Sequence, residues 1–283
     1  MNYRHTYHAG NFADVFKHVV LIALIQSLLQ KDTAFCYLET HAGTGFYDLF
    51  SAAAQKSREF DNGIKKIFAA NYPPALIQDY LSCVKKLNQP NKLRYYPGSP
   101  YFAQQFMRSC DRIVLSELHL ADAQTLKKNF TREKNIAVHH QDGYQSLKAF
   151  LPPKERRGLV LIDPPYEKNN ELMSLPQILA QALKRWETGI YALWYPIKTR
   201  QQMMPFYRAL KTTIQRPFLT VELCIHFDEI ATQLNGSGIV IINPPWQLDQ
   251  QLENVLPWLS STLSCSALQA EKSVKIERWE SSR

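Results

Sequence analysis

The sequence predicts an α/β fold in which helices cover both faces of a mostly parallel sheet. Seven short apolar runs, rich in β-branched and aromatic residues, follow one long apolar helix near the amino terminus. Segments with helical spacing separate most of these runs, a pattern typical of parallel sheets that are buried on both faces. The last two runs are too close together for a long helix between them, so the seventh strand is expected to run antiparallel.

Composition is that of an ordinary globular protein, with 283 residues of which 45% are hydrophobic and 20% are charged. No uninterrupted apolar stretch has the length of a membrane span, and the first residues lack the apolar segment of a secretory signal, so we expect a cytoplasmic protein with no membrane partner. The five scattered cysteines have no metal-ligand spacing and predict reduced thiols and no metal site. The net charge of +8 favours a polyanionic partner, with a solvated basic surface as the alternative.

The first helix is expected over residues 12–30, with Asn11 as its amino-terminal cap. The seven strands are expected at residues 34–39, 112–117, 135–140, 158–163, 189–195, 218–225 and 237–243.

More chain separates the first two strands than one crossover helix needs. Two further helices are predicted there, over residues 58–70 and 74–88. We therefore expect a small helical insert at 48–96, placed on the rim of a core formed by residues 1–47 and 97–263. The polar, unpatterned residues 264–283 are expected to form a loosely held tail.

Acidic residues end or follow the first four predicted strands. In open parallel sheets ligands bind at the carboxyl edge, where an acid suits the paired hydroxyls of a ribose. The turn Gly43-Thr44-Gly45 lets the backbone approach such a ligand closely, although the GxGxxG fingerprint of a nicotinamide dehydrogenase is missing. Each acid alone could be a cap or turn residue. Four acids at the ends of successive strands favour a ligand pocket. These acids are Glu39, Glu117, Asp142 and Asp163.

Residues 163–166, Asp-Pro-Pro-Tyr, follow a buried strand. The prolines fix the backbone and lack N–H groups, so nearby carbonyls stay free to accept hydrogen bonds. The exocyclic nitrogen of adenine is a poor nucleophile, and acceptors on its hydrogens favour the form that attacks a methyl group. Asp163 and the Pro164 carbonyl are the expected acceptors, and Tyr166 is expected to stack on the base. A rigid turn is the structural alternative.

A second, similar stretch, Asn243-Pro244-Pro245-Trp246, follows the seventh predicted strand. Because asparagine replaces the acid, we expect a structural end to that strand, forming a lip of the pocket, and keep amino-group chemistry as the alternative.

The amino-terminal region is rich in polar rings with cations nearby, which suits an extruded base and its phosphates. For His18 the structural alternative is a core imidazole with both ring nitrogens satisfied. The candidate residues here are Tyr3, His5, Lys17 and His18.

The stretches HAGNFADVFKH, LETHAGTG, YYPGSP, LSELH and LVLIDPPYE occur in this order. Together they resemble the bacterial 23S ribosomal RNA adenine-N6 methyltransferases of the large subunit methyltransferase J family, from the first residues to about Leu259. The resemblance implies the class I S-adenosylmethionine-dependent methyltransferase fold, which is Rossmann-like, with a seven-stranded sheet, an antiparallel last strand and a small helical insert.

The resemblance also implies site residues. Asp163, Pro164 and Tyr166 would be catalytic, and Tyr3 would contact RNA, with His5 and Lys17 as our additions. S-adenosylmethionine would be bound by His18, His41, Ser99, Glu117, Asp142, Gly143 and Asp163, and we add Gly43 from the glycine turn.

We therefore expect a monomeric enzyme that methylates N6 of a single, flipped adenine in 23S ribosomal RNA, either free or in a large-subunit assembly intermediate. One alternative is a DNA adenine-N6 methyltransferase, since the Asp-Pro-Pro-Tyr motif does not distinguish the sugar. The other is a non-catalytic RNA-binding protein with a methyltransferase fold.

Overall fold

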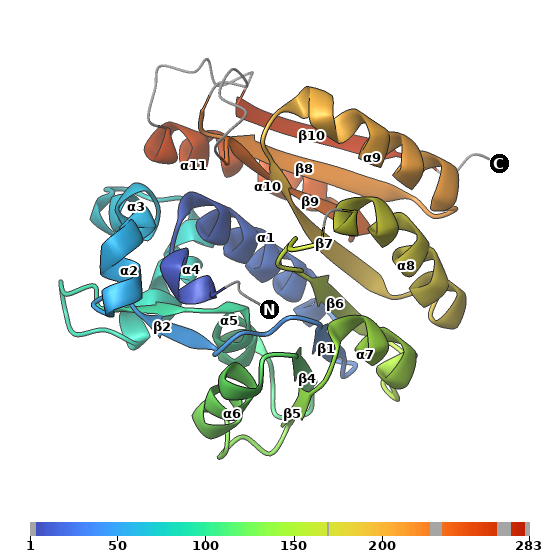
Figure 1. Ribbon diagram of the computed structural model, residues 1–283, viewed down its shortest axis with the longest axis horizontal. Coiled ribbons are helices and arrows are strands. Elements are labelled where there is room, and N and C mark those ends of the chain that lie inside the picture. The colour runs from blue at the N-terminus through green and yellow to red at the C-terminus, as the bar shows by residue number, and fades with distance from the viewer. Residues whose placement is uncertain (1–3, 169, 227–233, 265–272, 281–283) are drawn as a thin grey trace.

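A central eight-stranded sheet organises the protein, in the order β10-β8-β9-β7-β6-β1-β4-β5 (Figure 1). The computed structural model describes residues 4–168, 170–226, 234–264 and 273–280. The strands of this sheet are β1 (Cys36–Glu39), β4 (Arg112–Glu117), β5 (Ile136–His140), β6 (Gly158–Ile162), β7 (Ile190–Ile197), β8 (Phe218–Cys224), β9 (Gly236–Ile242) and β10 (Val274–Trp279).

Strand β9 lies between β7 and β8 and is antiparallel to both, while β5, β4, β1, β6 and β7 pair in parallel. The predicted reversal of the seventh strand is therefore confirmed. The protein has the α/β Rossmann-like methyltransferase fold, in which the reversed strand is inserted next to the last parallel one.

An eighth strand, β10, corrects the expectation of seven strands, and within the expected tail at 264–283 it shows that residues 274–279 belong to the sheet. Its six residues pair antiparallel with residues 218–223 of β8, and Trp279 stacks on Phe218 with ring centroids 6.1 Å apart. Val274 and Ile276 pack against the core while Lys275 and Glu277 pair with each other, so the strand alternates apolar and charged residues.

Two layers of helices cover the sheet. In β6, Leu159 and Leu161 face one buried cluster and Val160 and Ile162 face the other, which explains why this strand is apolar throughout. The first cluster contains residues of α1 (Phe12–Leu29), α5 (Ser99–Phe106), α6 (Leu120–Asn129), α10 (Leu248–Glu253) and α11 (Leu256–Leu263). The second contains residues of α7 (Gly143–Phe150), α8 (Glu171–Arg185) and α9 (Arg200–Thr213).

Helix α1 is the central helix of the first layer. The Asn11 side chain accepts a hydrogen bond from the Asp14 backbone N–H, which confirms the predicted cap. By length and composition alone α1 could cross a membrane, but 83% of it is buried inside the protein, as expected for a core helix. A short 3-10 helix, η1 (His5–Tyr7), precedes it.

The chain between β1 and β4 forms additional helices that stand to the left of α1 in Figure 1. The expected helix over 58–70 is divided at Gly63, where the backbone passes so close to Gly10 that a Cβ atom would lie 2.0 Å from its carbonyl oxygen. The buried side chains of this segment join the cluster around α1, and its division from the core as an insert stays a prediction. The elements are β2 (Phe46–Asp48), α2 (Ala52–Ser57), η2 (Glu59–Asn62), α3 (Ile64–Ala69), α4 (Ala75–Lys86) and β3 (Tyr95–Pro97).

Candidate active site

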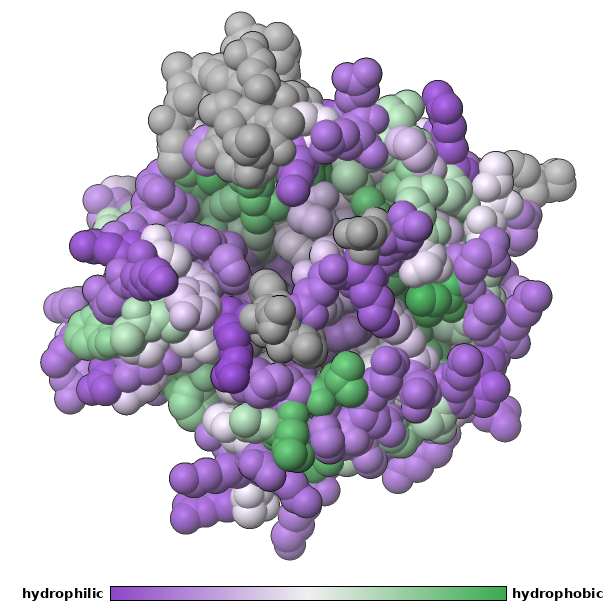
Figure 2. All heavy atoms as spheres, viewed as in Figure 1, coloured by the Kyte–Doolittle hydropathy of each residue, from purple (hydrophilic) through white to green (hydrophobic). Residues whose placement is uncertain are grey.

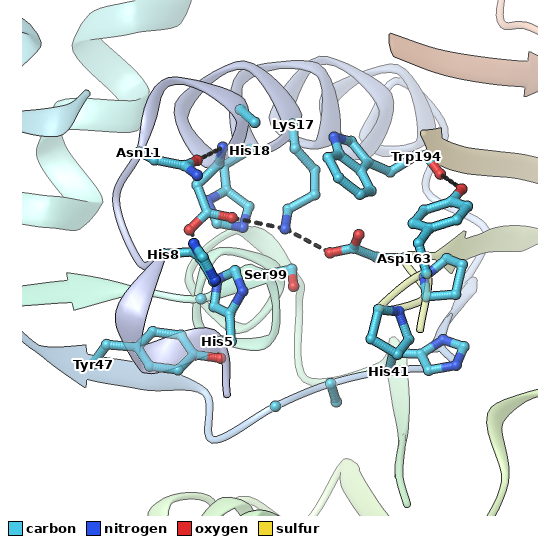
Figure 3. Close-up of a pocket in the computed structure, with 18 of the residues that line it drawn as sticks. His5, His8, Asn11, Lys17, His18, His41, Tyr47, Ser99, Asp163 and Trp194 are labelled. Atoms are coloured by element: carbon cyan, nitrogen blue, oxygen red, sulfur yellow. Dashed lines mark hydrogen bonds and ion pairs between the residues drawn. The ribbon is translucent and has the colours of Figure 1, made fainter. Parts of the chain in front are cut away.

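A cavity of about 310 Å³ opens at the carboxyl edge of β1, β4 and β6, within the usual size range of small-molecule sites. Figure 2 shows this hollowed face, and Figure 3 shows the lining side chains. The cavity brings together residues from η1, α1, the turn after β1, the start of α5 and the ends of β4 and β6. Ten of the predicted site residues line it: His5, Lys17, His18, His41, Gly43, Ser99, Glu117, Asp163, Pro164 and Tyr166.

Asp163, directly after β6, is held by a lysine from α1. Lys17 Nζ lies 2.6 Å from Asp163 Oδ2 (Figure 3) and 2.8 Å from Asp14 Oδ1, and all three side chains are largely buried. Burial opposes the charge on Lys17, but the two carboxylates outweigh this effect and hold the pKa of Lys17 well above its usual value. Asp163 Oδ1 has no hydrogen-bond partner in the described part of the chain and is free for a ligand.

Asp14 also holds the amino-terminal segment. Its Oδ2 accepts hydrogen bonds from the Gly10 backbone N–H and from His5 Nε2, each at 2.9 Å. Burial alone would favour the neutral acid, yet His5 and Lys17 hold the pKa of Asp14 well below its usual range. Asp14 was not among the predicted site residues. The available signal was its position three residues before Lys17, which places both on one helix face.

Tyr166 is fixed against the neighbouring strand. Its hydroxyl donates to the Trp194 carbonyl, its backbone is in the left-handed region with φ +53°, and the two rings are tilted by 58° with centroids 5.7 Å apart. These tilted rings are too close for a base to fit between them. Stacking of a base on the free side of Tyr166 stays a prediction, and Trp194 forms a further part of the wall that the sequence analysis did not assign.

Glu39 lies behind the cavity wall and is fully buried. Its oxygens accept hydrogen bonds from the Ser99 and Tyr37 hydroxyls, the second at 2.8 Å. Burial raises the pKa of Glu39 to about 8, against the opposing effect of these two hydrogen bonds. Ser99, rather than Glu39 itself, lines the cavity.

Glu117 and the glycine turn meet as the sequence predicts. Glu117 accepts hydrogen bonds from the backbone N–H groups of Gly43, at 2.8 Å, and His119, at 2.7 Å. Gly43 has φ +58°, and a Cβ atom there would lie 2.2 Å from Tyr47 Oη, so no side chain fits. Burial raises the pKa of Glu117.

Asp142 and Gly143 were expected at the cavity but do not line it. Asp142 caps α7 by accepting hydrogen bonds from the backbone N–H groups of Tyr144 and Gln145. At Gly143 a Cβ atom would lie 2.2 Å from the Thr40 carbonyl oxygen, so the glycine lets α7 approach the end of β1. Their role in cofactor binding stays a prediction.

Two histidines of the wall are neutral. Burial lowers the pKa of His18 well below its usual value and that of His41 to about 4. His18 Nδ1 lies 2.8 Å from Tyr96 Oη, while the buried Nε2 has no partner among the described residues. A structural core imidazole would have both nitrogens satisfied, so this arrangement favours a ligand contact. Tyr3 lies outside the described residues.

The second Pro-Pro stretch lies at the opposite edge of the sheet. Because β9 is antiparallel, Asn243 at its end meets the start of β7: its Nδ2 donates to the carbonyls of Glu187 and Gly189, each at 2.8 Å. Its Oδ1 accepts from Arg216 Nε. These contacts support the structural role, and the expectation that the stretch forms a lip of the pocket is wrong. Within the described ranges no group of His, Cys, Asp or Glu side chains could hold a metal ion.

Comparisons with known proteins agree with this geometry. Residues 32–276 match the family described as ribosomal RNA large subunit methyltransferase D, RlmJ. The chain is 45% identical over 263 residues to the ribosomal RNA large subunit methyltransferase J of Escherichia coli (strain K12), covering 93% of this chain and 94% of that protein. It is 44% identical over 264 residues to the protein of the same name from Haemophilus influenzae, with the same coverage.

A solved structure extends the likeness to the whole fold. The crystal structure of protein LPL1258 from Legionella pneumophila superimposes with a TM-score of 0.86 at 36% identity, covering 98% of this chain and 99% of that one. The cavity at the carboxyl edge of the sheet and these matches lead to one conclusion: the chain is an enzyme that belongs to the ribosomal RNA large subunit methyltransferase J family.

Proposed function

We propose that this enzyme transfers a methyl group from S-adenosylmethionine to N6 of a single adenine in 23S ribosomal RNA. The observation that carries the proposal is the placement of Asp163. Lys17 occupies one of its carboxylate oxygens and leaves the other free in a cavity that also contains Tyr166. A fixed acceptor beside an aromatic ring suits an amino group on a planar base.

The cavity residues fit the methyl donor. This compound carries a carboxylate, two cationic groups and a ribose, and the wall offers Glu117 with the Gly43 turn, the Ser99 hydroxyl, His41 and the unpartnered Nε2 of His18. We propose that these residues hold it together with Asp142 and Gly143. When bound, the donor supplies an electrophilic methyl group attached to sulfur.

The side chains would act mainly by positioning. Lys17 orients the Asp163 carboxylate, Asp163 and the Pro164 carbonyl accept the hydrogens of the adenine amino group, and Tyr166 aligns the ring. The target base must leave its stack to reach them, which costs least in RNA loops and ends.

The partner is proposed to be 23S ribosomal RNA, either protein-free or in a large-subunit assembly intermediate, and the net charge of +8 favours binding to its phosphates. We further propose that the enzyme works as a monomer in the cytoplasm. The non-catalytic alternative is not retained, because the family consists of enzymes.

A direct test compares transfer of labelled methyl groups to a protein-free 23S ribosomal RNA transcript and to duplex DNA of matching sequence. We expect one N6-methyladenosine per RNA chain, located by mass spectrometry, and no label in DNA. Efficient labelling of DNA would support the alternative of a DNA adenine methyltransferase. Labelling of RNA at cytosine or guanine would reject the adenine assignment.

A further inference from the structure

The helical segment between β1 and β4 reaches the cavity through two buried tyrosines. Tyr80 on α4 and Tyr96 on β3 are both fully buried, and their hydroxyl oxygens lie 3.2 Å apart. Tyr96 Oη in turn lies 2.8 Å from His18 Nδ1. A continuous line of hydrogen bonds therefore runs from α4 to a histidine on the cavity wall.

Only one direction of this line gives both hydroxyl protons an acceptor. If Tyr80 donates to Tyr96 and Tyr96 donates to His18 Nδ1, both hydroxyl protons are used. In the opposite direction the Tyr80 proton would have no acceptor among the described residues, although the group is buried. The favoured direction makes Nδ1 the acceptor, so the proton of the neutral ring is carried by Nε2.

Aromatic packing holds the imidazole in this orientation. Phe102 on α5 stacks on Tyr80 with ring centroids 5.2 Å apart and a 13° tilt, and it lies 4.8 Å from the His18 ring. His18 itself is 1% exposed. Its ring cannot turn over without displacing Phe102 or Tyr96, so the position of Nε2 is fixed along with its proton.

We propose that the Tyr80–Tyr96 pair fixes the proton of His18 on Nε2 and so makes this atom a hydrogen-bond donor for the carboxylate of the methyl donor. The identity of the ligand rests on the proposed function, whereas the tautomer rests on the protein alone. Tyr80 and Tyr96 are thus positioning residues, and the added helical segment has a role in cofactor binding although neither tyrosine lines the cavity.

A cation lies near this atom. Lys17 is the neighbour of His18 in sequence and acts on it electrostatically more strongly than Asp14 does in the opposite sense. Five acids line the cavity, Asp14, Glu59, Glu117, Asp122 and Asp163, and of these Asp163 and Glu117 suit the cationic and hydroxyl groups of the donor. Its carboxylate is its only anionic group, and an N–H donor beside a lysine matches that group.

The tautomer is tested without any ligand by nitrogen NMR of the protein labelled with ¹⁵N-histidine, with His18→Gln used to assign the signals. We expect a pyridine-type Nδ1 and a pyrrole-type Nε2 for His18 at neutral pH. In Tyr96→Phe we expect a second population with the proton on Nδ1, and in Tyr80→Phe a smaller one. A wild-type ring protonated on Nδ1 or on both nitrogens would overturn the proposal.

The role toward the carboxylate is tested by calorimetry with two ligands. S-adenosylhomocysteine carries the carboxylate, and 5′-methylthioadenosine is a related nucleoside without it. We expect Tyr96→Phe to weaken binding of S-adenosylhomocysteine by about three- to tenfold. The affinity for 5′-methylthioadenosine should stay within about twofold of the wild-type value. Equal weakening for both ligands would indicate a general loss of structure and would overturn this part.

Tyr191→Phe is the matched control. The Tyr191 hydroxyl is as buried as that of Tyr96 and is hydrogen-bonded to the carbonyls of Ala182 and Trp186, away from the cavity. The Tyr191→Phe substitution should change neither the His18 signals nor the preference between the two ligands. If the wild-type protein bound neither nucleoside, the proposed function would fail while the NMR result would still decide the tautomer.

Discussion

The Asp163→Asn variant tests the role of Asp163 in methyl transfer with little expected effect on the stability of the fold. Removing one partner of a buried ion pair usually costs about 3–5 kcal/mol, because the other charge is left uncompensated. Here Lys17 keeps Asp14 at 2.8 Å, and the asparagine oxygen can still accept from Lys17. We therefore expect the free energy of unfolding to fall by only about 1 kcal/mol.

Activity should respond far more strongly. The substitution removes the negative charge and places either an amide N–H or a weaker acceptor before the adenine amino group. We expect the single-turnover rate of methyl transfer to fall by about 10²- to 10⁴-fold, the range observed when a positioned acid or base is removed.

Three measurements test this reasoning together. Rates are measured with labelled methyl donor and an RNA transcript, cofactor affinity by calorimetry, and unfolding in urea. Because Asp163 is also expected to contact the cofactor, we expect some loss of cofactor affinity, a far larger loss of the rate at saturating cofactor, and a small change in stability. Turnover near the wild-type rate would refute the acceptor role. A loss of cofactor affinity as large as the loss of rate would show that Asp163 acts mainly in cofactor binding.

Three further outcomes are expected. Asp14→Ala should lower the free energy of unfolding by about 3 kcal/mol, because Lys17, His5 and the Gly10 N–H lose their shared acceptor; a loss below about 1 kcal/mol in urea unfolding would contradict this. The pKa of Glu39 is raised to about 8 in the folded protein, so the folded state keeps a proton that the unfolded state releases above about pH 4.5. Wild-type stability should therefore fall relative to Glu39→Gln as the pH rises from 5 to 8 without cofactor, and a constant difference in urea unfolding across these pH values would show that Glu39 is ionised in the fold. Trp194→Ala removes the ring beside Tyr166 and should lower kcat/KM for RNA by about tenfold with little effect on cofactor affinity; an unchanged kcat/KM would place the base elsewhere.

Local patterns predicted the sheet well. Each of the seven expected strands is present, with ends that agree within one or two residues, because long apolar runs bounded by polar turns leave little choice of structure. The acids at the strand ends also indicated the site correctly, because Glu117 and Asp163 line one cavity.

Features that depend on contacts between distant parts of the chain could not be predicted from the sequence. The Asp14 side chain and its partners come together only because η1 folds back over α1 and β6 ends beside them. No local sequence pattern encodes this arrangement. The Asn243 stretch was placed on the wrong edge because its position depends on strand direction and not on its own residues. Strand β10 was missed because its six residues, of which only the first four alternate between apolar and charged, are too few to be distinguished from a tail.

Strand β10 also limits aggregation of the protein through an unpaired strand edge. It covers the open side of β8, whose seven residues are all buried. It presents Lys275, Glu277 and Arg278, and Arg278 is anchored to Asp249 at 2.8 Å. Charged residues on an outer strand discourage pairing with another chain. Shortening the carboxyl terminus past residue 274 would leave a long apolar edge free to recruit other molecules, so purification tags are better tolerated after residue 283 than in place of this strand.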